Sequence, residues 1–147
     1  MSDLYTKIWI HAIFTTKGAR QLITAPLESR LQNFIHDQLF ELACPVRIIN
    51  GMPDHIHILF LLNPARSMGE IVRKVKGGSS LWINQNKLCI QKFSWQPGYA
   101  AFSVSESQVQ RVFEYIVNQK EHHTKETLQE EYAHILELHG VLPNVIR

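Results

Sequence analysis

Residues 51–62 read Gly-Met-Pro-Asp-His-Ile-His-Ile-Leu-Phe-Leu-Leu, a turn signal followed by an apolar run that contains two histidines. The run has the length of a strand, and residues two apart on a strand point to the same face. His55 and His57 are therefore expected side by side, with Ile56 on the opposite face. Both faces are otherwise apolar, so we expect both to be covered. Two imidazoles held together on a rigid strand make half of a metal site.

The segments around this strand predict alternating strands and helices. Further strands, rich in β-branched and aromatic residues, are expected within 5–14, 46–50 and 93–103. Helices, with apolar residues at a helical period, are expected at 27–43, 67–83, 105–122 and 124–138. The predicted fold class is α+β: a ferredoxin-like or RRM-like (RNA-recognition-motif-like) βαββαβ antiparallel sheet with two extra C-terminal helices. We expect one domain over residues 1–147.

Several local signals predict where these elements begin and end. The Asn50-Gly51 dipeptide is a turn signal, so the strand before it and the histidine strand are expected to form an antiparallel hairpin. Ser67 has the spacing of a helix N-cap, with a glutamate three residues later. The Gly77-Gly78 pair is expected to interrupt that helix, and Thr124 is expected to cap the last one.

Composition indicates an ordinary globular domain. The chain has 147 residues, of which 45% are hydrophobic, and a formal charge of +2. That charge is compatible with a nucleic-acid partner without requiring one. No apolar window is long enough to span a membrane, and residues 1–7 lack the features of a signal peptide, so we expect a cytoplasmic protein. Cys44 and Cys89 lie in apolar surroundings and are expected to be free thiols.

The expected helix at 105–122 carries the second group of candidate site residues. Tyr115 and Gln119 are four apart, so they share a helix face, on the flank of the apolar stripe. A tyrosine is a poor nucleophile while neutral, and a metal on a scissile phosphate assists its attack. Two imidazoles and one amide oxygen would leave positions open for phosphate and water, and such ligands suit Mn²⁺ and Mg²⁺.

Four short stretches, taken together, form a pattern typical of one enzyme family. They are Pro-Asp-His-Ile-His at 53–57, Trp-Gln-Pro-Gly-Tyr at 95–99, Ser-Val-Ser at 103–105, and Tyr-Ile-Val-Asn-Gln at 115–119. The stretches 15–20, 76–80 and 122–123 add to it. In this order and spacing, over nearly the whole chain, they resemble the single-tyrosine transposases of the HUH superfamily, the short type encoded by minimal bacterial insertion sequences.

The resemblance implies a mechanism and a ligand set. His55, His57 and Gln119 would bind a divalent metal, Mg²⁺ or Mn²⁺, and Tyr115 would attack single-stranded DNA to give a 5′-phosphotyrosine link. It further implies that hairpins at the element ends are recognised. A homodimer is implied as well, in which the tyrosine helix of one subunit completes the site of the other in trans. In a bacterial cell, such a protein would be associated with the nucleoid when bound to DNA.

Other residues carry weaker signals. Five basic residues are candidates for contacts with DNA, although an ordinary solvated surface explains them equally well; they are Lys17, Arg20, Arg73, Lys74 and Lys76. His11 is expected in the core or facing the DNA. We expect His122 and His123 to cap the end of the tyrosine helix. Asp54 points to the other face from both histidines if the strand pattern extends to it, which favours a role in the turn over a contact with an imidazole.

Three other functions compete with transposition. A domesticated relative could bind hairpins without mobilising DNA, and its sequence could be identical at the site. An RRM-like nucleic-acid-binding module would share the topology, but the aromatic pair that such modules use for stacking is missing from the first and third strands. A zinc protein would need a third ligand at ordinary zinc spacing, and none lies near His55 and His57 in the sequence.

Overall fold

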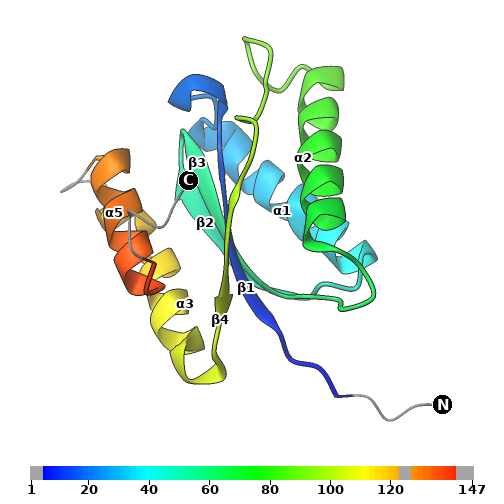
Figure 1. The fold of residues 1–147 in the computed structure, drawn as a ribbon. Coiled ribbons are helices and arrows are strands. Elements are labelled where there is room, and N and C mark those ends of the chain that lie inside the picture. The colour runs from blue at the N-terminus through cyan, green and yellow to red at the C-terminus, as the bar shows by residue number, and fades with distance from the viewer. Residues whose placement is uncertain (1–4, 123–126, 142–147) are drawn as a thin grey trace.

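A computed structural model describes residues 5–122 and 127–141, and it confirms the α+β fold (Figure 1). Within these residues the sheet has four antiparallel strands in the order β2-β3-β1-β4. Helices α1 and α2 cover one face, and α3 and α5 lie against the other (Figure 1). The order of elements is the predicted βαββαβ followed by helices, with the histidine strand β3 in the centre of the sheet.

The strands are β1 (Trp9–Thr15), β2 (Val46–Met52), β3 (His55–Leu61) and β4 (Ala100–Val104). The α-helices are α1 (Ala25–Glu41), α2 (Met68–Gln85), α3 (Val109–Val117), α4 (Gln119–His122) and α5 (Leu128–Leu138). Two 3-10 turns, η1 (Lys17–Ala19) and η2 (Glu106–Gln108), follow β1 and precede α3. None of the described helices is long and apolar enough to cross a membrane.

The main core lies between the sheet and the pair α1 and α2. Ile56 and Ile58 of β3 point into it, as the alternation predicted. Helix α2 begins at the expected cap, where the Ser67 hydroxyl accepts a hydrogen bond from the Glu70 backbone N–H. The predicted interruption at Gly77-Gly78 is wrong, because α2 continues through both glycines to Gln85. A Cβ at Gly78 would meet only the flexible end of the Gln38 side chain of α1.

The hairpin between β2 and β3 is present, but its turn is not at Asn50-Gly51. Strand β2 continues to Met52, and the turn consists of Pro53 and Asp54. Gly51 pairs with Ile56 inside the ladder, where an added Cβ would overlap the His55 carbonyl. Glycine is therefore required here for the close approach of two backbones.

The second face of the sheet is also covered, as expected. Leu59 of β3 packs in a smaller cluster with Val112 and Ile116 of α3. The covering helices belong to the same chain. The amide Nδ2 of Asn50 on β2 donates to the Ile116 carbonyl at 2.9 Å, and the Lys120 ammonium donates to the Gly51 carbonyl at 2.6 Å. These bonds hold α3 and α4 against the hairpin that carries the histidines.

The C-terminal helices differ in their limits from the prediction. The expected helix at 105–122 is divided at Asn118, where α3 ends and α4 begins. The last helix is capped by Thr127 and not by Thr124, which lies outside the described residues. Thr127 and Glu130 form a reciprocal capping box, in which each side chain binds the other residue's backbone N–H. This cap fixes where α5 begins.

Candidate metal centre and nucleophile

The two histidines of β3 lie side by side, fully buried, with their ring centroids 5.2 Å apart. The Nδ1 atom of each ring already has a partner. His55 Nδ1 lies 2.6 Å from Asp54 Oδ1, and His57 Nδ1 lies 2.8 Å from His11 Nε2. Partners of this kind fix the orientation of an imidazole and direct its other nitrogen toward a ligand. The two Nε2 atoms face a common space, into which side chains from α4 and α5 reach.

Glu131 of α5 supplies a carboxylate to this space. Its Oε1 lies 2.6 Å from His57 Nε2 and 3.4 Å from His55 Nε2, and the residue is fully buried. One ligand atom from each of the three residues lies within 4.8 Å of the other two. The sequence analysis did not identify Glu131 and found no third ligand for a zinc-type site. The fold supplies one from 74 residues away.

Gln119, the predicted third ligand, is the first residue of α4 and is also fully buried. Its Oε1 lies 3.2 Å from His55 Nε2. Its amide nitrogen has no hydrogen-bond partner among residues 5–122 and 127–141. An unpaired N–H group in the interior costs free energy. The contact of its Oε1 with His55 places Gln119 in the same cluster as His55, His57 and Glu131.

Tyr115 of α3 contacts the cluster through its ring. The ring packs edge-on against His57, with centroids 5.9 Å apart and an interplanar angle of 71°. Its hydroxyl oxygen is shielded from solvent although the residue as a whole is only half-buried. The structure thus brings together the predicted nucleophile and all three predicted ligands within one chain.

The polar groups of the cluster shift one another's pKa values. Burial opposes a charge on His55, but hydrogen bonds to Asp54 and Glu131 outweigh it and raise the pKa of His55 to about 9. Burial likewise opposes a charge on Glu131, but hydrogen bonds to both histidines hold the pKa of its carboxyl well below the ordinary value. At neutral pH and without metal, the site therefore contains a buried imidazolium–carboxylate pair.

Two further histidines, His11 and His139, form a chain of contacts that leads to His57. His11 of β1 lies behind His57, and its Nδ1 is 2.8 Å from Nε2 of His139, the residue that ends α5. Burial, reinforced by the neighbouring His57 and His139, lowers the pKa of His11 well below its usual range, and burial lowers the pKa of His139 to about 4. Neutral imidazoles have one donor and one acceptor, so His11 can satisfy either tautomer of His57. His11 is thus a core histidine that contacts a site residue.

The cluster fits a divalent metal ion. Its side chains offer two imidazole nitrogens, a carboxylate oxygen and an amide oxygen, a mixed nitrogen and oxygen set that first-row divalent ions accept. Both imidazoles have oriented Nδ1 atoms, and the single carboxylate offsets part of the charge of an ion in a buried site. The bond from His55 to Asp54 corrects the expectation that Asp54 acts only in the turn.

The candidate DNA-binding residues fall into two groups. Lys17 and Arg20 are exposed on and beside η1, and this turn contacts the segment that leads to β4, because the Gly18 N–H donates to Gln96 Oε1 at 3.0 Å. Lys76 reaches the same segment and donates to the carbonyls of Gln96 and Gly98. Arg73 and Lys74 are exposed on α2, which covers the opposite face of the sheet from the histidines (Figure 1).

Two histidines that follow the tyrosine helix are not described in full. His122 is the last residue of α4, and its side chain is not described; His123 lies outside the described residues. Their predicted role at the end of the helix therefore stays a prediction.

The two cysteines are free thiols, as expected, with Cys44 buried and Cys89 partly buried.

Known proteins share this sequence pattern and this fold. The profile of the transposase family described as IS200-like matches residues 4–119. The ISDra2 transposase TnpA of Deinococcus radiodurans is 26% identical over 121 residues, which make up 79% of this chain and 84% of that protein.

Two solved structures are similar in fold. A candidate transposase from Deinococcus radiodurans R1 has a TM-score of 0.66 and 23% identity, covering 81% of this chain and 95% of that one. A REP-associated tyrosine transposase, solved bound to a REP hairpin, has a TM-score of 0.60 and 16% identity, covering 84% and 74%. The family match spans most of the chain and confirms the resemblance that the motifs indicated: the chain belongs to the IS200-like transposases.

Proposed function

We propose that this transposase cuts and rejoins single-stranded DNA, with Tyr115 as the nucleophile and a 5′-phosphotyrosine as the intermediate. The observation that carries the proposal is the contact of the Tyr115 ring with His57, in a buried cluster that also contains His55, Gln119 and Glu131. A nucleophile beside convergent metal ligands is what phosphoryl transfer through a covalent intermediate needs.

The proposed step conserves the phosphodiester bond. A bond forms between Tyr115 Oη and the scissile phosphorus while the bond from phosphorus to the 3′ oxygen breaks. Tyr115 gives up its hydroxyl proton, and the leaving 3′ oxygen gains one. Because the phosphotyrosine keeps the energy of the original bond, a 3′-hydroxyl can later attack it and rejoin DNA without a nucleotide cofactor.

A divalent metal, Mg²⁺ or Mn²⁺, would be held by His55, His57, Gln119 and Glu131. When bound, such an ion draws charge from the scissile phosphate and stabilises the crowded transition state. Asp54 and His11 orient the two imidazoles from behind. Gln119 and Glu131 come from separate helices, so the positions of α4 and α5 together determine whether the site is complete.

Single-stranded DNA with hairpins is the substrate class that we propose. The related REP-associated transposase was solved with a hairpin, and an IS200-like family member would meet hairpins at element ends. An RRM-like mode of binding is disfavoured by the structure. Trp9, the aromatic residue that β1 contributes to the face such a module would offer, is buried against Val112 and Ile116 of α3, and α3 and α5 cover this face.

A covalent-adduct assay tests this function directly. The protein is incubated with Mn²⁺ or Mg²⁺ and a labelled pool of hairpin oligonucleotides with randomised single-stranded flanks, so that no target sequence has to be assumed. We expect a labelled protein–DNA adduct that survives a denaturing gel and is lost when EDTA is present. A protein that binds the hairpins but forms no adduct with either metal would be a domesticated hairpin-binding relative, and the proposal would be wrong.

Whether two subunits exchange their tyrosine helices can be decided by mixing inactive variants. The resemblance implies a homodimer with sites composed in trans. In that arrangement, Tyr115→Phe protein and His55→Ala/His57→Ala protein would together contain one intact site per mixed dimer. We expect the co-refolded mixture to form the adduct although neither variant forms it alone, which is the outcome that the trans arrangement requires. A mixture that forms no adduct would mean that each Tyr115 acts beside the histidines of its own chain, where its ring packs against His57.

A further inference from the structure

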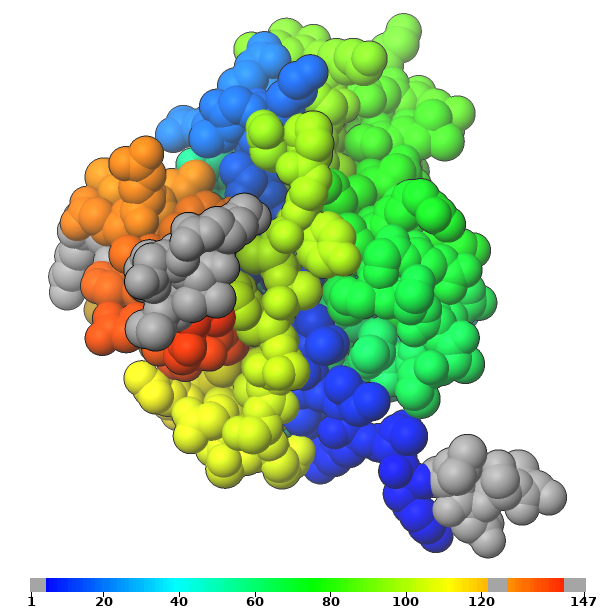
Figure 2. Space-filling model, in the orientation of Figure 1, coloured from blue at the N-terminus to red at the C-terminus, as the bar shows by residue number. Residues whose placement is uncertain are grey.

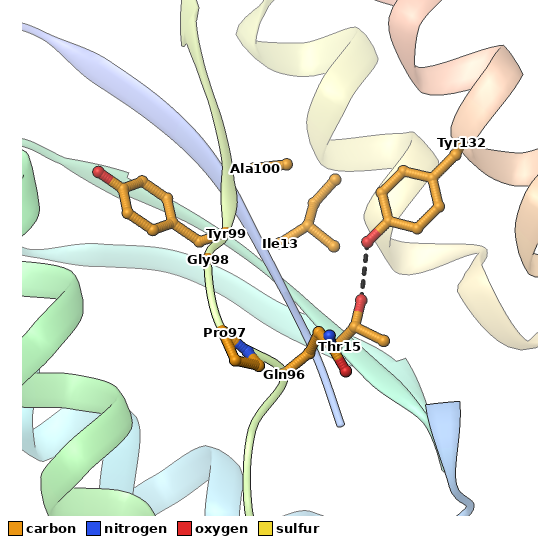
Figure 3. Close-up of a pocket in the computed structure, with 8 residues that line it drawn as sticks. All are labelled: Ile13, Thr15, Gln96, Pro97, Gly98, Tyr99, Ala100 and Tyr132. Atoms are coloured by element: carbon orange, nitrogen blue, oxygen red, sulfur yellow. Dashed lines mark hydrogen bonds between the residues drawn. The ribbon is translucent and has the colours of Figure 1, made fainter. Parts of the chain in front are cut away.

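A cavity of about 220 Å³ lies beside the metal centre, between β1, the segment that leads into β4, and α5 (Figure 3). Its lining includes Ile13, Thr15, Gln96, Gly98, Ala100 and Tyr132. None of these residues belongs to the proposed ligand set. Figure 2 shows the chain at β4 crossing the surface between α5 and α2.

The register of the sheet places this cavity directly next to the site. Thr15 pairs with His55 and Ile13 pairs with His57 across the β1–β3 ladder, so the cavity and the histidines occupy the same sheet face, one strand apart. Adjacent strands are about 4.8 Å apart. On α5, Tyr132 lines the cavity while the preceding residue, Glu131, contacts both histidines.

The walls of the cavity are held in place by specific contacts. The Tyr132 hydroxyl is hydrogen-bonded to Thr15 Oγ1 at 2.7 Å, so the ring stands over β1 (Figure 3). On the opposite side, the Lys76 ammonium donates to the Gln96 carbonyl at 2.7 Å and also to the carbonyl of Gly98, whose φ of +83° turns the chain into β4. Both walls of the cavity are therefore fixed by contacts within the chain.

The size and chemistry of the cavity fit one planar ring system. Pockets for drug-sized ligands occupy about 300–1,000 Å³, so this cavity is small by comparison. Ile13 and Ala100 form an apolar floor, and Tyr132 offers an aromatic ring at one side. The Gln96 amide and the backbone of 96–98 provide polar groups at the rim. This combination favours an aromatic ring with a polar edge, such as a nucleobase.

The surrounding charge favours a nucleic acid as the source of that ring. Lys17 and Arg20 are exposed beside η1, which joins the Gln96 end of the cavity through the bond from the Gly18 N–H. Lys76 adds a third cation at the same rim. Cations next to an aromatic-lined cavity are the arrangement by which proteins bind single-stranded DNA, with phosphates on the cations and a base against an aromatic ring.

We propose that this cavity binds one unpaired nucleobase next to the phosphate that Tyr115 attacks, and so selects the nucleotide at the cleavage position. The inference rests on the proposed function, because it assigns the base to the DNA strand that enters the site. It makes Tyr132, Ala100 and Gln96 specificity-determining residues that touch a base and not the reacting phosphate.

Two measurements test the proposal. In the first, Tyr115→Phe protein is titrated with hairpin oligonucleotides in which one flanking nucleotide at a time is abasic, and binding is followed by fluorescence anisotropy. We expect an abasic site at one position to weaken binding about tenfold, the effect of losing one stacked base. In the second, DNA recovered from wild-type adducts of the randomised pool is sequenced, and we expect a base preference at that same position.

A cavity-filling variant supplies the decisive comparison. Ala100→Phe should bind intact and abasic oligonucleotides equally and should lose the base preference, whereas Ser103→Tyr, a bulky change at an exposed position of the same strand, should retain both effects. Tyr132→Ala, which enlarges the cavity, serves as a second variant if Ala100→Phe does not fold. An unchanged preference in both cavity variants would overturn the proposal. Absence of any wild-type adduct would instead contradict the proposed function, while the binding measurement would still decide on the cavity.

Discussion

Replacing Tyr115 by Phe is expected to abolish the covalent protein–DNA adduct. The change removes one oxygen atom and keeps the ring that packs against His57, so the fold and the metal centre should be retained. Loss of a nucleophile lowers the rate by roughly 10⁴-fold or more, because no other group can take its place in the covalent step. The measurement is adduct formation with Mn²⁺ and the randomised hairpin pool, together with the melting temperature, which should stay within a few degrees of the wild type.

A second tyrosine, Tyr132, lies near the histidines, so the experiment can distinguish between two possible nucleophiles. Tyr132 is close to the cluster, but its hydroxyl is hydrogen-bonded to Thr15, the cross-strand neighbour of His55. Burial raises the pKa of Tyr132, which opposes the anionic form needed for attack. Tyr132→Phe should therefore still yield a covalent adduct. If the adduct persisted in Tyr115→Phe and vanished in Tyr132→Phe, the nucleophile would have to be reassigned.

The histidine strand could be predicted from sequence because its information is local. Alternation of side chains along β3 requires His55 and His57 to share a face, and the structure shows them on it. The alternation of side chains does not extend to Asp54, the residue before the strand. Asp54 belongs to the turn and not to the strand, so its side chain is not bound by the alternation and reaches back to His55 Nδ1 at 2.6 Å. The contact between Asp54 and His55 was not predicted, because the turn was expected at Asn50-Gly51 and Asp54 was treated as part of the strand.

Glu131 could not be predicted in the same way, since its role depends on how α5 docks. Nothing near Glu131 in the sequence points to β3. The two meet only through the packing of α5 on the sheet, which buries Glu131 and Ile135 on the same face of the helix. One signal was present. Glu131, Ile135 and Leu138 have the spacing of an apolar helical stripe, so a carboxylate occupies a position where a core residue is expected. A charge in such a position needs a partner in the interior.

The charge balance of the site leads to the second large prediction, that Glu131→Gln weakens Mn²⁺ binding by at least about 100-fold. Groups that only orient a metal ligand already contribute about 10- to 100-fold to metal affinity, and a direct ligand should contribute no less. His55, His57 and Gln119 are neutral when they coordinate, so without Glu131 a dication would be buried with no compensating charge among these side chains. Gln119→Ala, which removes a neutral ligand, should have the smaller effect.

The chain contains a matched control for this change. Glu130, the residue before Glu131, faces the helix cap and is exposed, and glutamine can replace glutamate in a capping box. Glu130→Gln should therefore bind Mn²⁺ like the wild type in isothermal titration calorimetry. Thermal unfolding gives an independent measurement, since a metal at about 100 times its Kd stabilises the fold by about 2.7 kcal/mol. That stabilisation should be present in Glu130→Gln and reduced to about 0.4 kcal/mol or less in Glu131→Gln at the same Mn²⁺ concentration. Unchanged or tighter binding in Glu131→Gln, with binding lost in Gln119→Ala, would mean that the carboxylate competes with the metal for the histidines and that Gln119 is the third ligand.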